Sequence, residues 1–235
     1  EGLVEIPYTP VNSFPIMALP AFILSGALME SAGISRRLVA VAESMAGPFT
    51  GGMAASPILS CLFFGALSGS GPATTAAVGM LMIPAMARHG YDRGYAGAVT
   101  SSSGGLGVVI PPSIPMVIYG VAASQSIADL FIAGFIPGVM LAVGLMTMNY
   151  FRSKKKKYQG DGKTLSAKKI AVTMREGFWS LLAPVIILGG IYTGFFTPTE
   201  AAIVSIFYTL FVGIFIYKEI EVKGVMKALE STTRI

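Results

Sequence analysis

Two stretches of this sequence bring serine, threonine, glycine and proline together inside apolar runs. Residues 68–75 read Ser-Gly-Ser-Gly-Pro-Ala-Thr-Thr, and residues 101–115 hold a Ser-Ser-Ser-Gly-Gly run followed by Pro111 and Pro112. A continuous helix is disfavoured in both stretches, because glycine weakens a helix and proline removes a backbone donor. The carbonyls freed in this way, together with the hydroxyl groups, are hard oxygen ligands suited to Na⁺. The chemistry that these residues allow is therefore ion coordination and hydrogen bonding.

The candidate binding residues lie at these two breaks. We expect helix amino termini at the breaks to face an anionic group, and freed carbonyls to hold a cation. The interpretation without a binding site is a pair of helix kinks with close-packed glycines. The predicted Na⁺ ligands are Ser68, Gly69, Ser70, Ser103, Gly104, Gly105 and Gly107. The predicted substrate-binding residues are Ser70, Gly71, Thr74, Thr75, Pro112 and Ser113.

Nucleophilic catalysis is the alternative chemistry for Ser68 or Ser70. A nucleophilic serine needs a base within hydrogen-bond reach, and the one histidine of the sequence, His89, lies in a separate polar turn. Neither serine is the centre of a Gly-x-Ser-x-Gly motif, which marks many serine hydrolases. With one histidine and one cysteine, Cys61, the chain cannot build a Cys/His metal site either. We therefore expect no enzymatic activity, and no cofactor besides Na⁺ as a coupling ion.

The composition is that of a protein embedded in a lipid bilayer. Of 235 residues, 53% are hydrophobic and 12% are charged, and the mean hydropathy is +0.69. That charged fraction is about half the fraction in a typical soluble domain. The net charge of +5 comes from clustered basic residues and not from a basic face on a soluble fold, which argues against nucleic-acid binding.

Charge-free runs mark the segments inside the membrane, since about 20 apolar residues cross a bilayer as a helix. The run at residues 44–87 is long enough for two passes and has polar residues 68–75 near its middle, so we predict a re-entrant helical hairpin. The run at residues 94–128 is interrupted by glycines and prolines, which predicts one broken helix. The sequence thus predicts an all-α integral membrane protein with about five transmembrane helices, one hairpin and one broken helix. The remaining charge-free runs are residues 11–29, 130–151, 177–199 and 201–217.

Basic residues set the predicted orientation, because cytoplasmic loops carry an excess of lysine and arginine. Residues 152–176 hold nine of the 17 Lys and Arg residues and are predicted to form a cytoplasmic loop. With a hairpin at residues 44–87, all 17 fall on the cytoplasmic side. Residues 32–45 mix apolar and charged side chains, which predicts either an amphipathic helix in the cytoplasmic interface or a plain connector. The acidic residues left outside are Glu1, Glu5, Asp129 and Glu200.

Five motifs follow one another along nearly the whole chain. They are residues 65–75 (GALSGSGPATT), 90–92 (GYD), 106–114 (LGVVIPPSI), 130–138 (LFIAGFIPG) and 189–202 (GGIYTGFFTPTEAA). In type and order they resemble the large membrane subunit of tripartite ATP-independent periplasmic (TRAP) transporters. The resemblance implies a bacterial or archaeal transporter of the cell inner membrane with an elevator-like movement and Na⁺ coupling. It also implies a periplasmic binding protein that delivers small organic acids, such as C4-dicarboxylates or sialic acid, and a small membrane subunit as a partner.

Members of that family have two inverted repeats, each with one hairpin and one broken helix. This sequence shows one of each, so the resemblance implies the middle of the subunit, with half of the binding site outside it. We assign residues 1–151 to the first repeat, residues 152–176 to the basic loop and residues 177–235 to the start of the second repeat. Two other membrane classes stay open: a different hairpin-type ion-coupled carboxylate carrier, and a channel or structural subunit.

Overall fold

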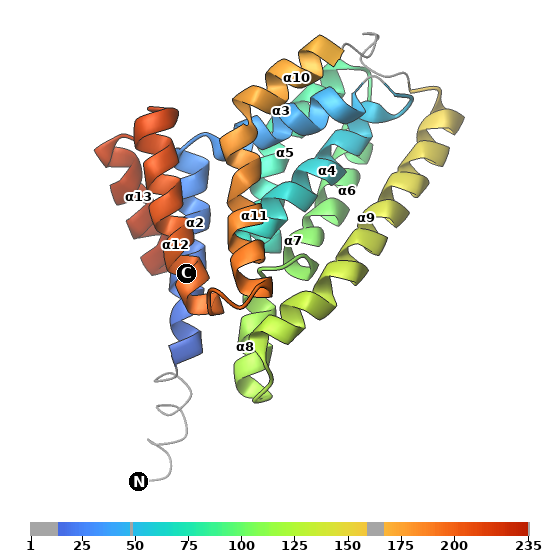
Figure 1. Ribbon diagram of the computed structural model, residues 1–235. Helices are drawn as coiled ribbons and strands as arrows, with labels where there is room; N and C mark the ends of the chain where they lie inside the picture. The colour runs from blue at the N-terminus through green and yellow to red at the C-terminus, as the bar shows by residue number, and fades with distance from the viewer. Residues whose placement is uncertain (1–13, 48, 159–166, 235) are drawn as a thin grey trace.

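The computed structural model describes residues 14–47, 49–158 and 167–234, and every regular element in these ranges is a helix (Figure 1). This confirms the all-α class. The predicted exterior residues Glu1 and Glu5, and part of the basic loop, lie outside the described residues. In chain order the elements are η1 (Phe14–Met17), α2 (Ala18–Ser31), α3 (Ile34–Ala46), α4 (Gly52–Ser68), α5 (Gly71–Arg88), α6 (Arg93–Gly104), α7 (Leu106–Val109), α8 (Ile114–Ala122), α9 (Ile127–Lys156), α10 (Ala167–Glu176), α11 (Phe178–Tyr192), α12 (Pro198–Phe211), η2 (Val212–Ile216) and α13 (Val222–Arg234).

Helices α4 and α5 form the predicted hairpin. Helix α4 ends at Ser68, and Gly69 follows in the left-handed conformation with φ of 61°, which glycine adopts without steric cost. Helix α5 begins at Gly71, where the Ser70 side chain caps it by accepting a hydrogen bond from the Ala73 N–H (3.5 Å). The chain therefore reverses within two residues at the hairpin tip.

Helices α6, α7 and α8 form the predicted broken helix. The break is confined to residues 110–113 and does not include the serine and glycine run. Gly105, between α6 and α7, has helical angles (φ −58°, ψ −25°), so the serine and glycine run at residues 101–105 does not unwind. Helical geometry is lost at residues 110–113, and α8 continues at an angle of 40°. Glycine only lowers helix stability, whereas Pro111 and Pro112 remove donors and push the preceding residues towards extended backbone.

Helix length and hydropathy identify two helices that can cross a bilayer alone among the described residues: α9, and α12 together with η2. Up to five spans result if each bent pair of apolar helices counts as one. These pairs are α2 with α3, α6–α7 with α8, and α10 with α11. The bend between α2 and α3 is 70°, which turns the amphipathic helix α3 across the direction of α2, as expected of an interfacial helix.

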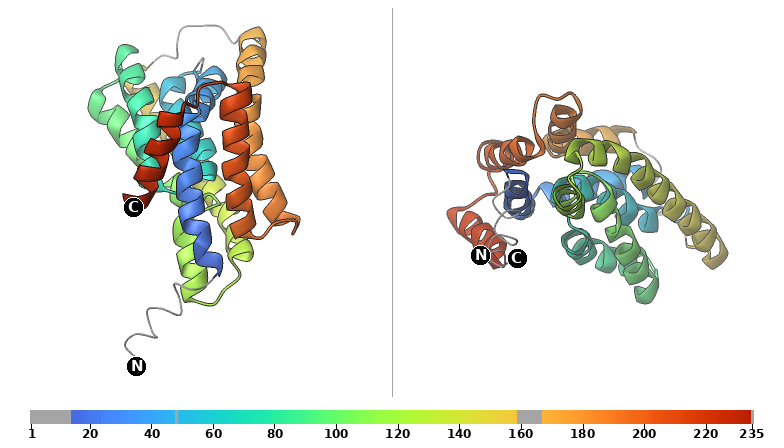
Figure 2. Two further views of the ribbon diagram at one scale, coloured as in Figure 1. Left: turned by 90° about the vertical axis from the view of Figure 1, so that its left-hand side faces the viewer. Right: turned by 90° about the horizontal axis from the view of Figure 1, so that it is seen from below.

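The helices pack in two groups that meet at the hairpin. Helix α2 lies between α12 and α13 (Figure 2), and the hairpin packs against α6, α7 and α9. Each group has its own cluster of buried apolar side chains. Leu67, one residue before the end of α4, belongs to the cluster around α2 and α12, whereas Phe64 belongs to the hairpin cluster. The hairpin tip therefore lies at the boundary between the two groups.

The segment predicted to be a basic loop and the carboxyl-terminal segment both contain helices. Helix α9 extends through the first residues of the basic segment to Lys156, and α10 (Ala167–Glu176) forms its end. Lysines in the last turn of α9 stabilise that turn by interacting with the negative end of the helix dipole. The carboxyl-terminal residues form α13 (Val222–Arg234), which contacts α2.

Candidate functional site

The hairpin tip and the break of the second helix meet at one point. The Ile114 N–H donates a hydrogen bond to the Gly69 carbonyl oxygen (3.1 Å), which joins the tip to the first turn of α8. A Cβ built on Gly69 would lie 2.8 Å from the Pro112 carbonyl oxygen, so the contact requires glycine. Ser113 precedes α8 and donates its hydroxyl to the Val108 carbonyl oxygen (2.5 Å), which holds the two sides of the break together.

The hairpin tip and the break of the second helix each bring one helix carboxyl end and one helix amino end to this point. Helix α4 ends at the tip and α7 ends at the break, while α5 and α8 begin there. Helix amino ends carry partial positive charge and unpaired N–H groups, and carboxyl ends carry partial negative charge and unpaired carbonyls. The arrangement can therefore stabilise an anion and a cation close together without a charged side chain.

Ser68 and Thr74 form a buried pair of hydroxyl groups inside the tip. Their oxygen atoms are 2.8 Å apart, and the two residues are 4% and 0% exposed. The Ser68 hydroxyl oxygen also lies 3.3 Å from the Ser70 N–H nitrogen. Gly107 covers this pair: a Cβ built on it would overlap the Thr74 hydroxyl and lie 3.0 Å from the Ser70 carbonyl oxygen. The predicted residues on both breaks thus share one small polar region.

A second close approach joins the start of α5 to the end of α6. A Cβ built on Gly71 would lie 3.2 Å from the Gly104 carbonyl oxygen, and one on Gly104 would overlap the Thr75 hydroxyl. Thr75 donates that hydroxyl to the Gly71 carbonyl oxygen (2.9 Å). Gly71, Thr75 and Gly104 therefore belong to the region around the tip.

Two of the predicted Na⁺ ligands are placed differently. Ser103 donates its hydroxyl to Val99 of its own helix (2.6 Å) and lines a cavity of about 400 Å³ between α6 and α9. Gly105 is exposed, and a Cβ built on it would meet only the Ser102 carbonyl oxygen of its own helix turn, at 3.3 Å. The hydrogen bond of Ser103 and the one close approach at Gly105 are both formed within their own helix, and neither joins that helix to the tip.

A cavity of about 140 Å³ lies beside the tip, between the hairpin and α2. Ser68 and Ser70 line it from the hairpin, and Glu30 is the one charged side chain in its wall. Gly26 brings α2 close, since a Cβ built on it would lie 3.4 Å from the Ser68 Cα. Neither Glu30 nor Gly26 stood out in the sequence. The sequence marks these two residues only by their position. Glu30 follows directly after the first charge-free run, and Gly26 lies within that run.

The tip lacks the geometry of a serine nucleophile with its base. The Ser68 hydroxyl is partnered by Thr74, and the Ser70 hydroxyl oxygen accepts from the Ala73 N–H. His89, the single histidine of the sequence, lies beyond the opposite end of α5, with its Nδ1 2.9 Å from the Ala85 carbonyl oxygen. The arrangement offers oxygen ligands and helix ends, which suit binding and release of ions.

Comparison with known families assigns nearly the whole chain to one family. Residues 3–235 match the family described as the DctM component of the tripartite ATP-independent periplasmic transporter. The chain belongs to this family. The resemblance carried by the five motifs is thereby confirmed. The chain, called the TRAP chain below, is a transporter component and not an enzyme.

Curated relatives of the TRAP chain are permeases with different substrates in their names. It is 46% identical, over 94% of its length, to the isethionate TRAP transporter permease protein DctMQ of Oleidesulfovibrio alaskensis. It is 44% identical, over 91%, to the sialic acid TRAP transporter permease protein SiaT of Haemophilus influenzae. It is 43% identical, over 92%, to the C4-dicarboxylate TRAP transporter large permease protein DctM of Pseudomonas aeruginosa. The chain covers 35%, 34% and 50% of these three relatives.

Proposed function

We propose that the TRAP chain is the translocating part of a secondary transporter that imports small organic acids together with Na⁺ across the cell inner membrane. The observation that carries the proposal is the hydrogen bond from Ile114 to Gly69, which joins the hairpin tip to the break of the second helix. Non-helical backbone at membrane depth is costly unless it is buried in protein or lines a water-filled cavity, and this chain has two such segments. Their meeting at one point favours a binding site over two independent kinks.

Na⁺ coupling is supported by the oxygen atoms gathered at the tip. The carboxyl ends of α4 and α7 supply carbonyl oxygens, each with two lone pairs, and the buried hydroxyls of Ser68 and Thr74 lie at the tip with them. A hydroxyl oxygen has two lone pairs and keeps acceptor capacity when it takes part in one hydrogen bond. The proposed Na⁺ ligands at the tip are therefore Ser68, Thr74 and carbonyl oxygens of residues 68–70, with the carbonyls near Gly107 beside them.

Import of an organic acid is supported by the two helix amino ends. Ser70, Gly71 and Thr75 lie at the start of α5, and Pro112 and Ser113 lie at the start of α8. Helix amino ends carry partial positive charge, which favours carboxylate and similar anions. The relatives named above for isethionate, sialic acid and C4-dicarboxylates all have small organic anions in their names. We therefore propose a small organic acid as the substrate, held by these two helix ends.

The same proposal includes two protein partners. A tripartite transporter in this family has a periplasmic binding protein and a small membrane subunit besides the large one. We propose that the binding protein delivers the substrate from the side of the α11–α12 turn and that the basic ends of α9 and α10 face the cytoplasm. This orientation follows from the distribution of lysine and arginine in the sequence.

Uptake by the complete transporter in proteoliposomes tests the proposed function. Uptake of a labelled organic acid should require both the binding protein and an inward Na⁺ gradient. Uptake that needs the binding protein but not Na⁺ would remove the coupling. Uptake without the binding protein would favour a different hairpin-type carrier, and flux that follows the substrate gradient alone would indicate a channel.

A further inference from the structure

A third cavity, of about 610 Å³, lies away from the hairpin tip, where α3, the junction of α10 with α11, and η2 come together. Arg37 and Arg175 line it, and Glu176 is the one acidic residue in its wall. Trp179 and Tyr217 complete its aromatic side. None of these residues takes part in the site proposed for substrate and Na⁺.

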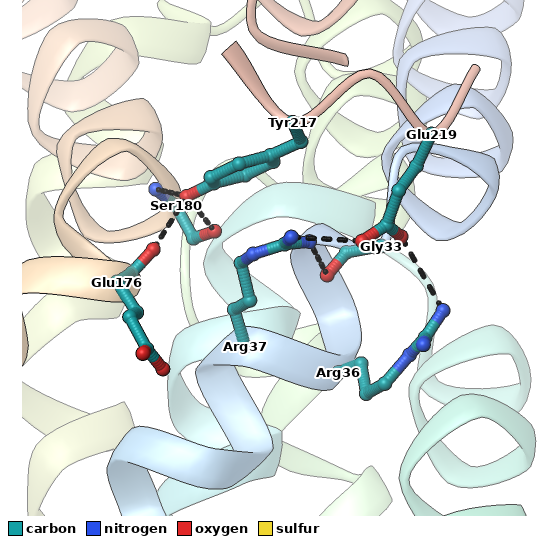
Figure 3. A network of polar contacts seen from close by, with 7 residues as sticks. All are labelled: Gly33, Arg36, Arg37, Glu176, Ser180, Tyr217 and Glu219. Atoms are coloured by element: carbon teal, nitrogen blue, oxygen red, sulfur yellow. Dashed lines mark hydrogen bonds and ion pairs between the residues drawn. The ribbon is translucent and has the colours of Figure 1, made fainter. Parts of the chain in front are cut away.

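Arg37 is held in place beside the cavity by contacts on several sides (Figure 3). Its guanidinium carbon lies 3.6 Å from the centre of the Tyr217 ring. It donates to the Gly33 carbonyl oxygen (3.2 Å) and to the Glu219 carboxylate (2.8 Å). A guanidinium has five N–H donors, so these two hydrogen bonds leave three for a further acceptor. The Arg37 side chain is 25% exposed, so the group is accessible but fixed.

Tyr217 is itself anchored, which makes the wall of the cavity a built surface. Its hydroxyl donates to the Glu176 carbonyl oxygen (3.1 Å) and accepts from the Ser180 N–H (3.2 Å). The Ser180 hydroxyl lies 2.9 Å from the same oxygen. Figure 3 shows these contacts joining the start of α11 to the segment after η2. The position of the aromatic ring under Arg37 is therefore determined by two separate helices.

Arg175 adds positive charge without a partner charge in the described part of the chain. It is exposed and takes part in no ion pair there, where the two ion pairs that form join Glu219 to Arg36 and Arg37. With the paired Glu219 beside Arg37 included, the cavity and its edge carry three guanidinium groups, of Arg36, Arg37 and Arg175, against two carboxylates, of Glu176 and Glu219. A further anionic group, from outside the chain, would complete the charge balance.

The rim of the cavity is apolar and lies at a bend typical of a membrane interface. Helix α10 meets α11 at 61°, and α10 packs on the amphipathic helix α3. Val172, Phe178 and Trp179 are exposed along this bend. Tryptophan and tyrosine are enriched where a protein crosses the headgroup layer. A free anion would make no use of this apolar rim, whereas a lipid would contact both the arginines and the rim.

We propose that this cavity binds an anionic phospholipid, with the headgroup phosphate between Arg37 and Arg175 and an acyl chain along Val172 and Trp179. Trp179, the single tryptophan of this sequence, lines the cavity and provides the probe. The complete transporter is reconstituted in nanodiscs that contain phosphatidylglycerol or phosphatidylcholine with brominated acyl chains, which quench nearby tryptophan. The difference from a Trp179→Phe variant isolates the signal of this residue.

Brominated phosphatidylglycerol should quench Trp179 more strongly than brominated phosphatidylcholine at the same mole fraction. Arg175→Gln should lower that preference about fivefold, the usual effect of one basic residue near an anionic headgroup. Arg175→Lys should keep most of it, which also shows that the site survives substitution. Arg36→Gln is the matched control, because Arg36 is 71% exposed, pairs with the same Glu219 and does not line the cavity.

Three results would overturn the proposal. Equal quenching by the two lipids in the unaltered protein would show that the cavity does not select an anionic headgroup. An equal loss in Arg36→Gln and Arg175→Gln would show general attraction to the membrane surface. Relief of quenching by added inorganic phosphate would show that the cavity takes a free anion. The readout is independent of transport, so each result can be separated from the test of Na⁺-coupled uptake.

Discussion

Gly65 of α4 lies directly against Gly107 of α7, so closely that a Cβ built on Gly65 would lie 2.8 Å from the Gly107 Cα. Gly107 also lies against Thr74 of α5. It is therefore wedged between the two arms of the hairpin, and its missing side chain sets the distance between the hairpin and the broken helix. Gly105, only two residues earlier, is exposed and faces away from this contact.

This pair of glycines gives the first prediction. Gly107→Ala should lower uptake per folded complex by roughly tenfold or more, because overpacking costs about 1–3 kcal/mol and would displace the break from the tip. Gly105→Ala should leave uptake near the parent level, since its backbone is helical and an added Cβ would meet only the Ser102 carbonyl oxygen of its own helix turn, at 3.3 Å. Uptake is measured in proteoliposomes and divided by the amount of folded protein. Equal effects of the two substitutions would mean that the close approach at Gly107 has no functional role.

Local composition was sufficient to predict the hairpin and the broken helix. The tip needs a left-handed residue and a capping side chain, and Gly69 and Ser70 provide them in adjacent positions. Pro111 and Pro112 fix the second break, because neither can donate a backbone hydrogen bond. The exact extent of the break was less predictable. Residues 101–105 stay helical because packing against the hairpin outweighs the weak helix propensity of glycine.

Features that depend on contacts between distant segments could not be predicted from one sequence. The cavity wall formed by Glu30 exists only because α2 packs beside the hairpin, with Gly26 at the closest approach. The amphipathic helices α10 and α13 carry many charges, so their segments resemble a loop and a tail when only charge is considered. Both could be found by their 3.6-residue periodicity.

Asn149 gives a prediction about the stability of the hairpin base. Its side chain is 5% exposed, donates to the Gly51 carbonyl oxygen (3.1 Å) and accepts from the Tyr95 hydroxyl (2.7 Å). Asn149→Leu leaves these two groups without that partner, as well as the Ser153 hydroxyl, which donates to the same side-chain oxygen (3.2 Å). The loss should cost about 1–3 kcal/mol for each group that water does not reach. Tyr95→Phe removes one hydrogen bond and should cost about 1 kcal/mol. Thermal unfolding in detergent measures both.

The double variant provides the control for this interaction. If Asn149 and Tyr95 act as a pair, Asn149→Leu combined with Tyr95→Phe should be less destabilised than the sum of the single variants. The reason is that the hydrogen bond between them can be lost only once. Strict additivity would show that the contact between the two side chains contributes nothing to stability.

Tyr217 gives a prediction that separates its hydroxyl from its ring. Tyr217→Phe removes the contacts with Ser180 and Glu176 but keeps the ring under Arg37, so we expect a loss of about 1 kcal/mol. Tyr217→Leu also removes the cation–π contact, which should add about 0.5–1 kcal/mol. The melting temperature should therefore fall in the order parent, Phe, Leu. A Leu variant as stable as the Phe variant would contradict a role for the ring beneath Arg37.

Membrane orientation can be tested with single cysteines. Lys156 at the end of α9 and Phe195 in the turn between α11 and α12 are both exposed, Phe195 by 82%. With Lys156→Cys, a membrane-impermeant thiol reagent should react only from the cytoplasmic side, and with Phe195→Cys only from outside. The native Cys61 is fully buried and gives little background. Reaction of both from one side would contradict the orientation derived from the basic residues.

Thr74 gives the most direct test of the proposed Na⁺ site. Its hydroxyl is fully buried at the tip, 2.8 Å from that of Ser68. Thr74→Val keeps the branched shape but removes one oxygen, and Ser68→Ala and Ser70→Ala remove oxygens next to it. We expect each substitution to raise the Na⁺ concentration for half-maximal uptake by roughly tenfold, since one hydrogen-bond-strength ligand contact is worth about 1–1.5 kcal/mol.

Thr100→Val is the matched control for Thr74→Val. Thr100 is also fully buried, but its hydroxyl donates to the Ala96 carbonyl oxygen of its own helix (2.9 Å), away from the tip. Both valine substitutions remove one buried hydroxyl, so both should change stability to a similar extent. Only Thr74→Val should change the Na⁺ dependence, because of the two threonines only Thr74 lies at the hairpin tip, beside the proposed Na⁺ ligands. An equal shift in both variants would trace the effect to general destabilisation, and no shift in either would place the cation elsewhere.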